Sequence, residues 1–339
     1  MTRRLLLGLV LASGCGTDGT GSPVDPPIDP PAEATPIERC LAGGGTFQQL
    51  WATSNQHGPV SSIAVGGSIV VLGSLDGSVK QWTTGGASPS YGVPFEDDTG
   101  IVVDALAFAH GEHDEVAGVD RDGRFTEWRV SDASPMRTVP VITDGALTAV
   151  AISSRQAAIA RGPESPEVRV IDRASGDVSP PLTTALWGAT SMAFAGEALF
   201  TAGHWYGVPE IERRSTESPD AVIEEWRESS LQGHVRAIAV DGVHLAAAGD
   251  SFVAILDPGA IAGDKTIVPV EGHAAVGVAL LTDMVATAGR EGSLRLWTTA
   301  GEPVATLTIP EPVGIARDAA GTTLFTSGPD GLLHAFGCK

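Results

Sequence analysis

Short apolar runs alternate with polar turns along most of this chain, and one apolar tripeptide returns seven times at intervals of roughly forty residues. The tripeptide has the form aliphatic, Ala, apolar, and its last copy ends in Arg. The copies are Ile63–Val65, Leu106–Phe108, Val150–Ile152, Met192–Phe194, Ile238–Val240, Val278–Leu280 and Ile315–Arg317. A period of this size indicates an array of similar units, none of which buries its apolar face alone. The pattern therefore predicts a repeat protein.

Each repeat continues with a second apolar run, a tight turn and a third apolar run. In four repeats the turn is an acidic residue followed by Gly, which supplies the positive backbone angle that a β-hairpin needs. These turns are Asp76-Gly77, Asp122-Gly123, Glu291-Gly292 and Asp330-Gly331. A stretch rich in Pro, Ser and Gly, such as Ser179–Pro181, then precedes a weaker fourth run, such as Val304–Leu307. Four short strands per repeat predict one propeller blade each, and hence an all-β ring of seven blades.

Three repeats resemble the WD40 family because a strand-turn-strand segment ends in Trp. These segments are Gly73–Trp82, Val116–Trp128 and Val285–Trp297. Two Gly-His pairs, Gly233-His234 and Gly272-His273, are similar to the pair that the family places ahead of the first strand, but lie closer to that strand. The other four repeats end without Trp, at Ile171-Asp172, Glu212-Arg213, Leu256-Asp257 and Phe336. The resemblance spans about Thr46 to Lys339. It implies a WD40-like propeller in which most blades lack the family's complete Asp-His-Ser-Trp network.

The first residues have the layout of a secretory signal. Arg3 and Arg4 precede the apolar run Leu5–Ala12, and small residues then lead to Cys15. Leu11–Cys15 resembles the cleavage motif of bacterial lipoproteins, with Ala where Leu is usual. The resemblance implies that residues 1–14 are removed and Cys15 is acylated, with an ordinary cleaved signal or an uncleaved anchor as alternatives. Gly follows the cysteine, and not the Asp that marks inner-membrane retention in enteric bacteria, so we expect an outer-membrane lipoprotein of the bacterial envelope.

Residues 15–37 are mainly Gly, Thr, Ser, Asp and Pro, a composition that predicts an extended tether without a core of its own. The expected organisation is thus a signal peptide at 1–14, a lipidated tether at 15–37 and a propeller at 38–339. The acyl chains would provide the membrane contact, and we expect the ring to be a monomer.

The two ends of the propeller region are expected to meet. The last repeat stops after its third run, Leu332–Phe336, and the run Thr46–Trp51 ahead of the first repeat could complete it. WD40 rings resemble this arrangement, with one blade built from both termini. Cys40 and Cys338 would then lie where a hairpin loop otherwise joins adjacent strands, so we expect a disulfide between them. Export from the cytoplasm favours this pairing. Two unrelated thiols are the alternative.

Composition and motifs exclude several function classes. The formal net charge of −20 argues against binding to nucleic acid or anionic lipid, which requires a basic footprint. The acidity indicates solubility or, alternatively, a surface that steers a ligand. The sequence has no Gly-rich phosphate loop, HExxH, paired CxxC or GxSxG. His110–Glu115 has metal-like side chains, but its spacing matches no familiar zinc pattern. Asp120–Gly123 resembles a calcium-loop fragment without the later Glu. We therefore expect no metal, no cofactor and no enzyme.

An enzyme that uses the central channel, such as a lactonase-like envelope hydrolase, is the alternative function. Propeller enzymes of that kind gather acidic, Asn or His ligands at the ends of the inner strands. The corresponding residues here are Ser62, Asp104, Thr148, Ser191, Arg236, Gly277 and Pro312. One carboxylate and one Arg do not make a metal cage, so this alternative would need a site built by longer loops.

The fourth repeat carries the strongest candidate binding surface. Its turn between the second and third runs is expanded and contains His204, Trp205 and Tyr206. In WD40-like rings such turns share a face with the loop that enters the same blade, where Trp187 lies. We expect these four residues to meet, with Arg161 from the neighbouring repeat as a charged contact.

Aromatic side chains with a polar edge favour contacts with peptide, glycan and protein. The predicted function is a lipid-anchored platform that binds an envelope protein or a surface glycan. The alternative is that Trp187 or Trp205 folds inward and fills space between blades.

Overall fold

The computed structural model describes residues 33–54, 58–84, 93–94, 102–108, 114–142, 145–161, 167–196, 198–219 and 221–339. All described helices and strands belong to one compact unit, Ala34–Lys339. The signal sequence, Cys15 and residues 110–113 of the His110–Glu115 cluster lie outside the described residues, as does most of the expected tether.

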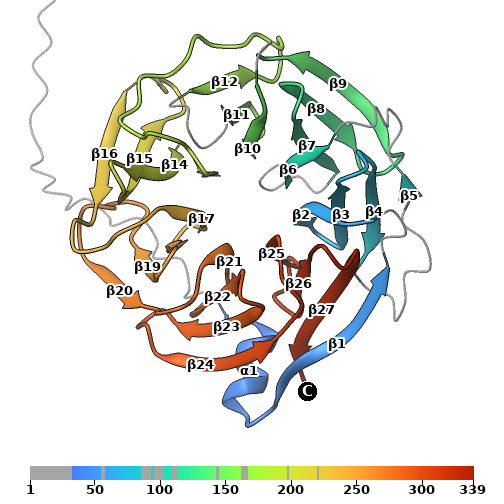
Figure 1. Ribbon diagram of the computed structural model, residues 1–339, viewed down its shortest axis with the longest axis vertical. Coiled ribbons are helices and arrows are strands. Elements are labelled where there is room, and N and C mark those ends of the chain that lie inside the picture. The colour runs from blue at the N-terminus through green and yellow to red at the C-terminus, as the bar shows by residue number, and fades with distance from the viewer. Residues whose placement is uncertain are drawn as a thin grey trace, which may run out of the picture. The chain divides into compact units, whose positions relative to one another are not determined.

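Seven small antiparallel sheets follow one another around a central axis, which confirms the predicted seven-bladed propeller (Figure 1). The first three blades contain β2 (Val60–Gly66), β3 (Ile69–Ser74), β4 (Val79–Thr83) and β5 (Val93–Pro94); β6 (Val103–Phe108), β7 (Glu115–Asp120), β8 (Arg124–Arg129) and β9 (Ser134–Pro140); and β10 (Leu147–Ile152), β11 (Gln156–Arg161) and β12 (Val168–Asp172). The next three contain β13 (Ser191–Ala195), β14 (Ala198–Trp205), β15 (Val208–Ser215) and β16 (Val222–Arg227); β17 (Val235–Val240), β18 (Leu245–Gly249), β19 (Phe252–Leu256) and β20 (Lys265–Pro269); and β21 (Ala275–Leu280), β22 (Met284–Gly289), β23 (Ser293–Thr298) and β24 (Pro303–Thr308). The seventh contains β25 (Gly314–Arg317), β26 (Leu324–Ser327), β27 (Leu332–Cys338) and β1 (Phe47–Ser54).

The strands are apolar on both faces because each blade packs between two others. In blade five, Ala247 and Phe252 pack in a cluster with blade four, whereas Ala248 and Val253 pack with blade six. Since successive side chains of a strand point to opposite faces, a strand buried on both faces reads as a continuous apolar run. The seven tripeptides fall on the innermost strand of each blade, where neighbouring blades approach one another.

The acidic-Gly turns lie where the sequence predicts, between the second and third strands of their blades. All four glycines have positive φ: Gly77 at 89°, Gly123 at 77°, Gly292 at 80° and Gly331 at 68°. An L side chain rarely adopts this conformation, so glycine is required for the tight connection.

Blade three differs from the expectation of four strands, because its described residues form only three. The predicted strand after Ser179–Pro181 is absent, and the Ile171–Val178 bridge is isolated. Proline has no N–H to donate to a ladder, so Pro180 and Pro181 prevent regular pairing. The edge of β12 is covered instead by irregular chain: the Ser179 amide donates to the Val170 carbonyl, and the Leu182 amide donates to the Val168 carbonyl.

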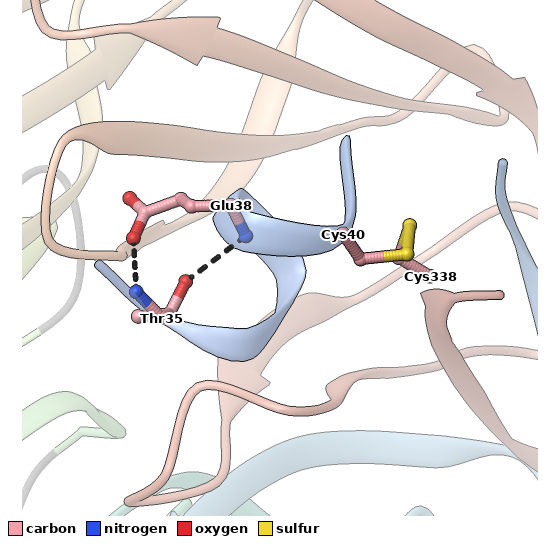
Figure 2. Close-up of a disulfide and its surroundings, with 4 residues drawn as sticks. All are labelled: Thr35, Glu38, Cys40 and Cys338. Carbon is pink, nitrogen blue, oxygen red and sulfur yellow. Dashed lines mark hydrogen bonds between the residues drawn. A yellow bond between two sulfur atoms is a disulfide. The ribbon is translucent and has the colours of Figure 1, made fainter. Parts of the chain in front are cut away.

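The chain ends close the ring as predicted. β1 pairs antiparallel with β27, from Phe47 opposite Cys338 to Ser54 opposite Leu332. Cys40 and Cys338 form the expected disulfide, with a Cα–Cα distance of 5.9 Å, and Figure 2 shows the bond beside the N-terminal helix. The two thiols are therefore partners, and the alternative of unrelated cysteines is wrong.

A short helix, α1 (Pro36–Ala42), leads into this closure and was not predicted. It begins two residues before the expected start of the propeller at residue 38. Thr35 and Glu38 form a capping box, in which each side chain bonds the other's backbone amide (Figure 2). Ile37 is 1% exposed in the core of blades six and seven, and Glu38 accepts a 2.6 Å hydrogen bond from the Asp283 amide. The helix therefore attaches the N-terminal segment to the ring before β1 begins.

Candidate functional site

The β14–β15 hairpin of blade four ends in a two-residue turn formed by Tyr206 and Gly207. Trp205 pairs with Val208 across the hairpin, and the two central residues have φ of 49° and 81°. Positive φ at both positions is the signature of a type I′ turn, which suits the twist of a hairpin. Tyrosine is an unusual residue in this left-handed conformation, which costs an L side chain roughly 1–2 kcal/mol. A ring held there is a candidate for function.

Three of the predicted aromatic residues come together at this turn. The ring centroids of Trp187 and Tyr206 lie 4.7 Å apart, and those of Trp205 and Tyr206 lie 5.0 Å apart at 87°. Trp187, Trp205 and Tyr206 are 52%, 39% and 66% exposed. We call these three residues the aromatic triad. The alternative in which a tryptophan folds inward between the blades does not match these exposures.

The loop that carries Trp187 is attached to β14 along its length. The Trp187 amide donates to the His204 carbonyl at 2.9 Å, and the Thr190 amide donates to the Ala202 carbonyl at 2.8 Å. Between these bonds, a Cβ added to Gly203 would lie 2.0 Å from the Gly188 carbonyl oxygen. Glycine at 203 therefore permits the close approach that brings Trp187 to the turn.

Arg227 is a member of the site that the sequence did not reveal. Its guanidinium carbon lies 4.8 Å from the centre of the Trp205 ring, a cation–π contact. The same guanidinium donates to Glu210 at 2.7 Å and forms an ion pair with Glu225 at 3.2 Å. Arg227 and Glu210 are opposite each other in the β15–β16 ladder. This register links residues that are far apart in sequence, and an isolated arginine in a fourth strand gives no signal of it.

Glu210 is completely buried beneath this ion pair. Burial raises the pKa of its carboxyl, although the hydrogen bond from Arg227 opposes that shift. Among the described residues, Glu210 Oε2 has no hydrogen-bond partner. The positive charge of Arg227 thus offsets part of the free-energy cost of burying the Glu210 carboxylate.

A second buried ion pair, Glu212 with Arg214, supports the loop from below. Both residues are 0% exposed, and the Arg214 Nη2 to Glu212 Oε2 distance is 2.5 Å. Glu212 also accepts hydrogen bonds from the Thr184 hydroxyl and the Ala185 amide, and Arg214 donates to the Thr183 carbonyl. The network attaches the segment before Trp187 to β15.

Glu210, Glu212 and Glu225 form the one grouping with metal-like geometry among the described residues, with ligand oxygens within 4.8 Å of one another. Arg214 and Arg227 already neutralise two of the three carboxylates. A divalent cation would have to displace or lie against these guanidiniums, so the group is better explained as an ion-pair network.

His204, the fourth residue predicted for this surface, does not belong to the triad. Its ring stacks on His234 of the next blade, with centroids 3.9 Å apart, and its Nδ1 accepts a 3.2 Å hydrogen bond from the Gly207 amide. Burial lowers the pKa of His204, and the positive charges of His234 and Arg236 lower it further against the opposing effect of Asp250. His204 therefore holds the turn from below as a neutral acceptor.

Arg161, the other predicted contact, lies at the end of β11. It forms an ion pair with Glu167 at 3.5 Å, and its neighbours include the backbone of Gly145. The cation whose guanidinium stacks on a ring of the triad is Arg227, from the same blade.

Blade six contains a buried side-chain network of the kind that the WD40 resemblance implies, which most blades were expected to lack. His273 is buried and contacts Glu291 at 2.5 Å and Thr287 at 2.9 Å, and the Trp297 indole donates to Thr287 at 3.1 Å. The register of blade five places Ala247 and Leu256 where blade six has Thr287 and Trp297. His234 also lies one residue closer to its strand than His273 does, and its ring stacks on His204.

The central channel is lined by several of the residues that the sequence places at the axis. Six of the predicted axis residues line a cavity of about 280 Å³, whereas Val313 and Gly314 take the place expected for Pro312. The two charged members are already paired: Asp104 with Arg121 at 2.9 Å, and Arg236 with Asp250 at 2.8 Å. The hydroxyls of Ser62 and Ser191 bond backbone groups of the neighbouring blades.

Comparison with the profiles of known protein families gives no match, and comparison with curated proteins gives none either. The arrangement of seven blades is consistent with the WD40 resemblance.

Proposed function

We propose that this protein is a lipid-anchored binding protein of the bacterial envelope, which presents the aromatic triad of blade four to a partner. The observation that carries the proposal is the triad itself. Three large rings are exposed together on one hairpin and its adjoining loop, and one of them is in a costly backbone conformation. Exposed aromatic clusters on a rigid scaffold are typical of recognition sites.

The support around the triad favours binding over accidental exposure. Trp187 is positioned by backbone bonds to β14, and the Trp205 ring packs against Arg227. The Tyr206 turn is held by His204. Side chains held in place before binding lose little conformational freedom when a partner arrives, and this loss is one of the main costs of association.

The attachment to the envelope is supported by the sequence at Arg3–Cys15. Among the described residues, no helix has the length and apolar character needed to cross a membrane. In the proposal, acyl chains on Cys15 hold the protein to the outer membrane, and the Pro-rich segment that follows allows the ring to reach a partner.

The envelope-hydrolase alternative has less support. Among the described residues that line the channel, the two charged side chains, Asp104 and Arg236, each form an ion pair with a neighbour. A hydrolase would need a general base or a metal-bound water.

Affinity capture from detergent-solubilised envelope tests the proposal. We expect the native chain to retain a defined partner and the Trp187→Ala, Trp205→Ala, Tyr206→Ala triple variant to lose it. The matched control is Leu75→Ala, which removes an exposed apolar side chain from the corresponding turn of blade one. Equal capture by the native chain and the triple variant, with equal melting temperatures, would exclude the triad as the binding surface.

A further inference from the structure

The aromatic triad is small and isolated compared with the surface that a folded protein partner needs. An aromatic side chain carries about 150–250 Å² of surface, so the observed exposures give the triad roughly 300–400 Å². A stable protein–protein interface takes about 800 Å² from each partner. The other exposed large apolar side chains among the described residues are Leu75, Met136, Ile223, Val243 and Val304. Four of these belong to other blades, and Ile223 lies at the opposite end of β16 from Arg227, so the triad does not extend into a larger apolar surface.

The geometry of the rings suits a ligand that has both a flat apolar face and a polar edge. Trp205 and Tyr206 meet edge to face, and Trp187 inclines at 45° to Tyr206, so the exposed faces form a corner and not a flat surface. Aromatic faces are electron-rich and attract the positive C–H edges of a ligand. A pyranose ring presents C–H groups on its faces and hydroxyls around its edge.

Hydroxyl-binding groups lie immediately beside these rings. The Arg227 guanidinium is stacked on Trp205, and both of its carboxylate contacts use the same nitrogen, Nη2. A guanidinium has five N–H donors, so other donors can bind hydroxyl oxygens. The Glu225 side chain is 40% exposed and supplies acceptor oxygens. An adjacent donor and acceptor match the paired hydroxyls of a sugar.

The charges of Arg227, Glu210 and Glu225 disfavour acidic ligands. Arg227 lies between two carboxylates, Glu210 and Glu225, so its positive charge is already compensated. An anionic ligand at the triad would meet Glu225 and a chain with a formal net charge of −20. A neutral ligand meets no such repulsion.

We infer that the aromatic triad, Arg227 and Glu225 form a binding site for a neutral oligosaccharide. The inference rests on the proposed function and specifies the ligand of the same site. The sugar stacks on Trp187 and Tyr206, and its hydroxyls bond to Arg227 and Glu225. Because the three rings cover only a few hundred Å², the site accommodates a short run of sugar units within a longer chain.

The test is titration calorimetry on the full-length chain in micelles of a detergent without a sugar headgroup. The probes are four neutral tetrasaccharides, built from glucose, galactose, mannose and N-acetylglucosamine, and one acidic tetrasaccharide built from galacturonic acid. We expect at least one neutral probe to bind, and the acidic probe to bind at least about tenfold more weakly than that one. Trp187→Ala and Tyr206→Ala should each weaken neutral binding by about tenfold or more, since exposed aromatic anchors dominate such contacts. Leu75→Ala should leave it unchanged.

The Glu225→Gln variant tests the charge argument, because its selectivity between acidic and neutral probes would not change if Glu225 had only a structural role. It keeps a hydrogen-bonding side chain and removes one negative charge, so binding of the galacturonate probe should improve by several-fold, whereas binding of the neutral probe should change much less. Equal effects on both probes would contradict the charge argument.

The outcomes separate this inference from the proposed function. If no neutral tetrasaccharide binds, the inference is wrong; if envelope capture still depends on the triad, the proposed function stands and the partner is a polypeptide. If a neutral probe binds equally well to the triad variants, it binds elsewhere and the inference is also wrong. If neither saccharide binding nor envelope capture depends on the triad, the inference and the proposed function both fail.

Discussion

The disulfide between Cys40 and Cys338 joins residues 298 positions apart, so breaking it should reduce stability by an amount that depends on this separation. In the unfolded chain the bond closes a loop that contains nearly the whole propeller. For a loop of this length, the chain-entropy argument gives a contribution of about 6 kcal/mol at 25 °C as an upper value. A domain of about 300 residues has an unfolding entropy near 0.6 kcal/mol per degree, so the melting temperature should fall by up to about 9 °C.

The folded ring should remain closed without the bond. β1 keeps its ladder with β27, the Thr46 and Lys339 backbones still pair, and Ile37 stays buried in the core of blades six and seven. Because the main effect is on the unfolded chain, the native β1 amides should keep their protection from hydrogen exchange.

Calorimetry of the native chain, with and without reductant, and of the Cys40→Ser, Cys338→Ser double variant measures this effect. The reduced native chain and the double variant should melt at the same lowered temperature, and reductant should not affect the double variant. A fall of less than about 2 °C would refute the entropic reasoning. Loss of β1 protection at temperatures where the other blades remain protected would show instead that the bond holds the folded ring together.

Two further predictions concern the blade-four turn. Tyr206→Asn should keep the free energy of unfolding within about 1 kcal/mol of the native value, because Asn tolerates positive φ and the relief of backbone strain offsets the lost ring contacts. Chemical denaturation measures this free energy, and a large loss would show that the tyrosine ring holds the turn. Stability should also decrease as the pH falls below about 6.5, because burial lowers the pKa of both His204 and His234 below the value of the unfolded chain, an effect that Arg236 reinforces against Asp250. The unfolded chain then binds more protons than the folded chain. The melting temperature should therefore fall less between pH 7.5 and pH 5 in a His204→Gln, His234→Gln variant than in the native chain. An equal fall in both would assign the pH dependence to other groups.

The paired register explains which parts of the site were predictable. His204, Trp205 and Tyr206 are consecutive, so their place at a turn followed from local sequence, and the layout of a blade suggested Trp187. Arg227 and Glu210 are separated by seventeen residues and meet because β15 and β16 pair in one particular register. A shift of that register by one residue would move Arg227 to the opposite face of the sheet.

The two Gly-His pairs also show that local sequence does not determine which contacts a side chain makes. They differ in their spacing to the following strand, because His234 directly precedes β17 whereas one residue separates His273 from β21; His273 forms a buried network and His234 stacks on another histidine. Blade five also has Ala247 and Leu256 where blade six has Thr287 and Trp297, the partners of that network. A dipeptide motif therefore does not fix the role of its side chain, which depends on the exact spacing to the strand and on the partners that neighbouring strands supply.

The sequence by itself determined the number of blades, the acidic-Gly turns, the closure of the ring by the N-terminal strand and the pairing of its two cysteines. The blades and turns follow from repeat period, strand alternation and backbone preference, which are local properties of the chain. The closure and the cysteine pairing follow from the incomplete last repeat and the unassigned run before the first. Only the tertiary structure decided that the described residues of blade three form three strands, that a buried ion pair of β15 bonds the segment that follows that blade, and that Arg227 accompanies the aromatic triad. Those contacts join residues from different strands and blades, and they depend on register and on packing between neighbouring sheets, which no local pattern specifies.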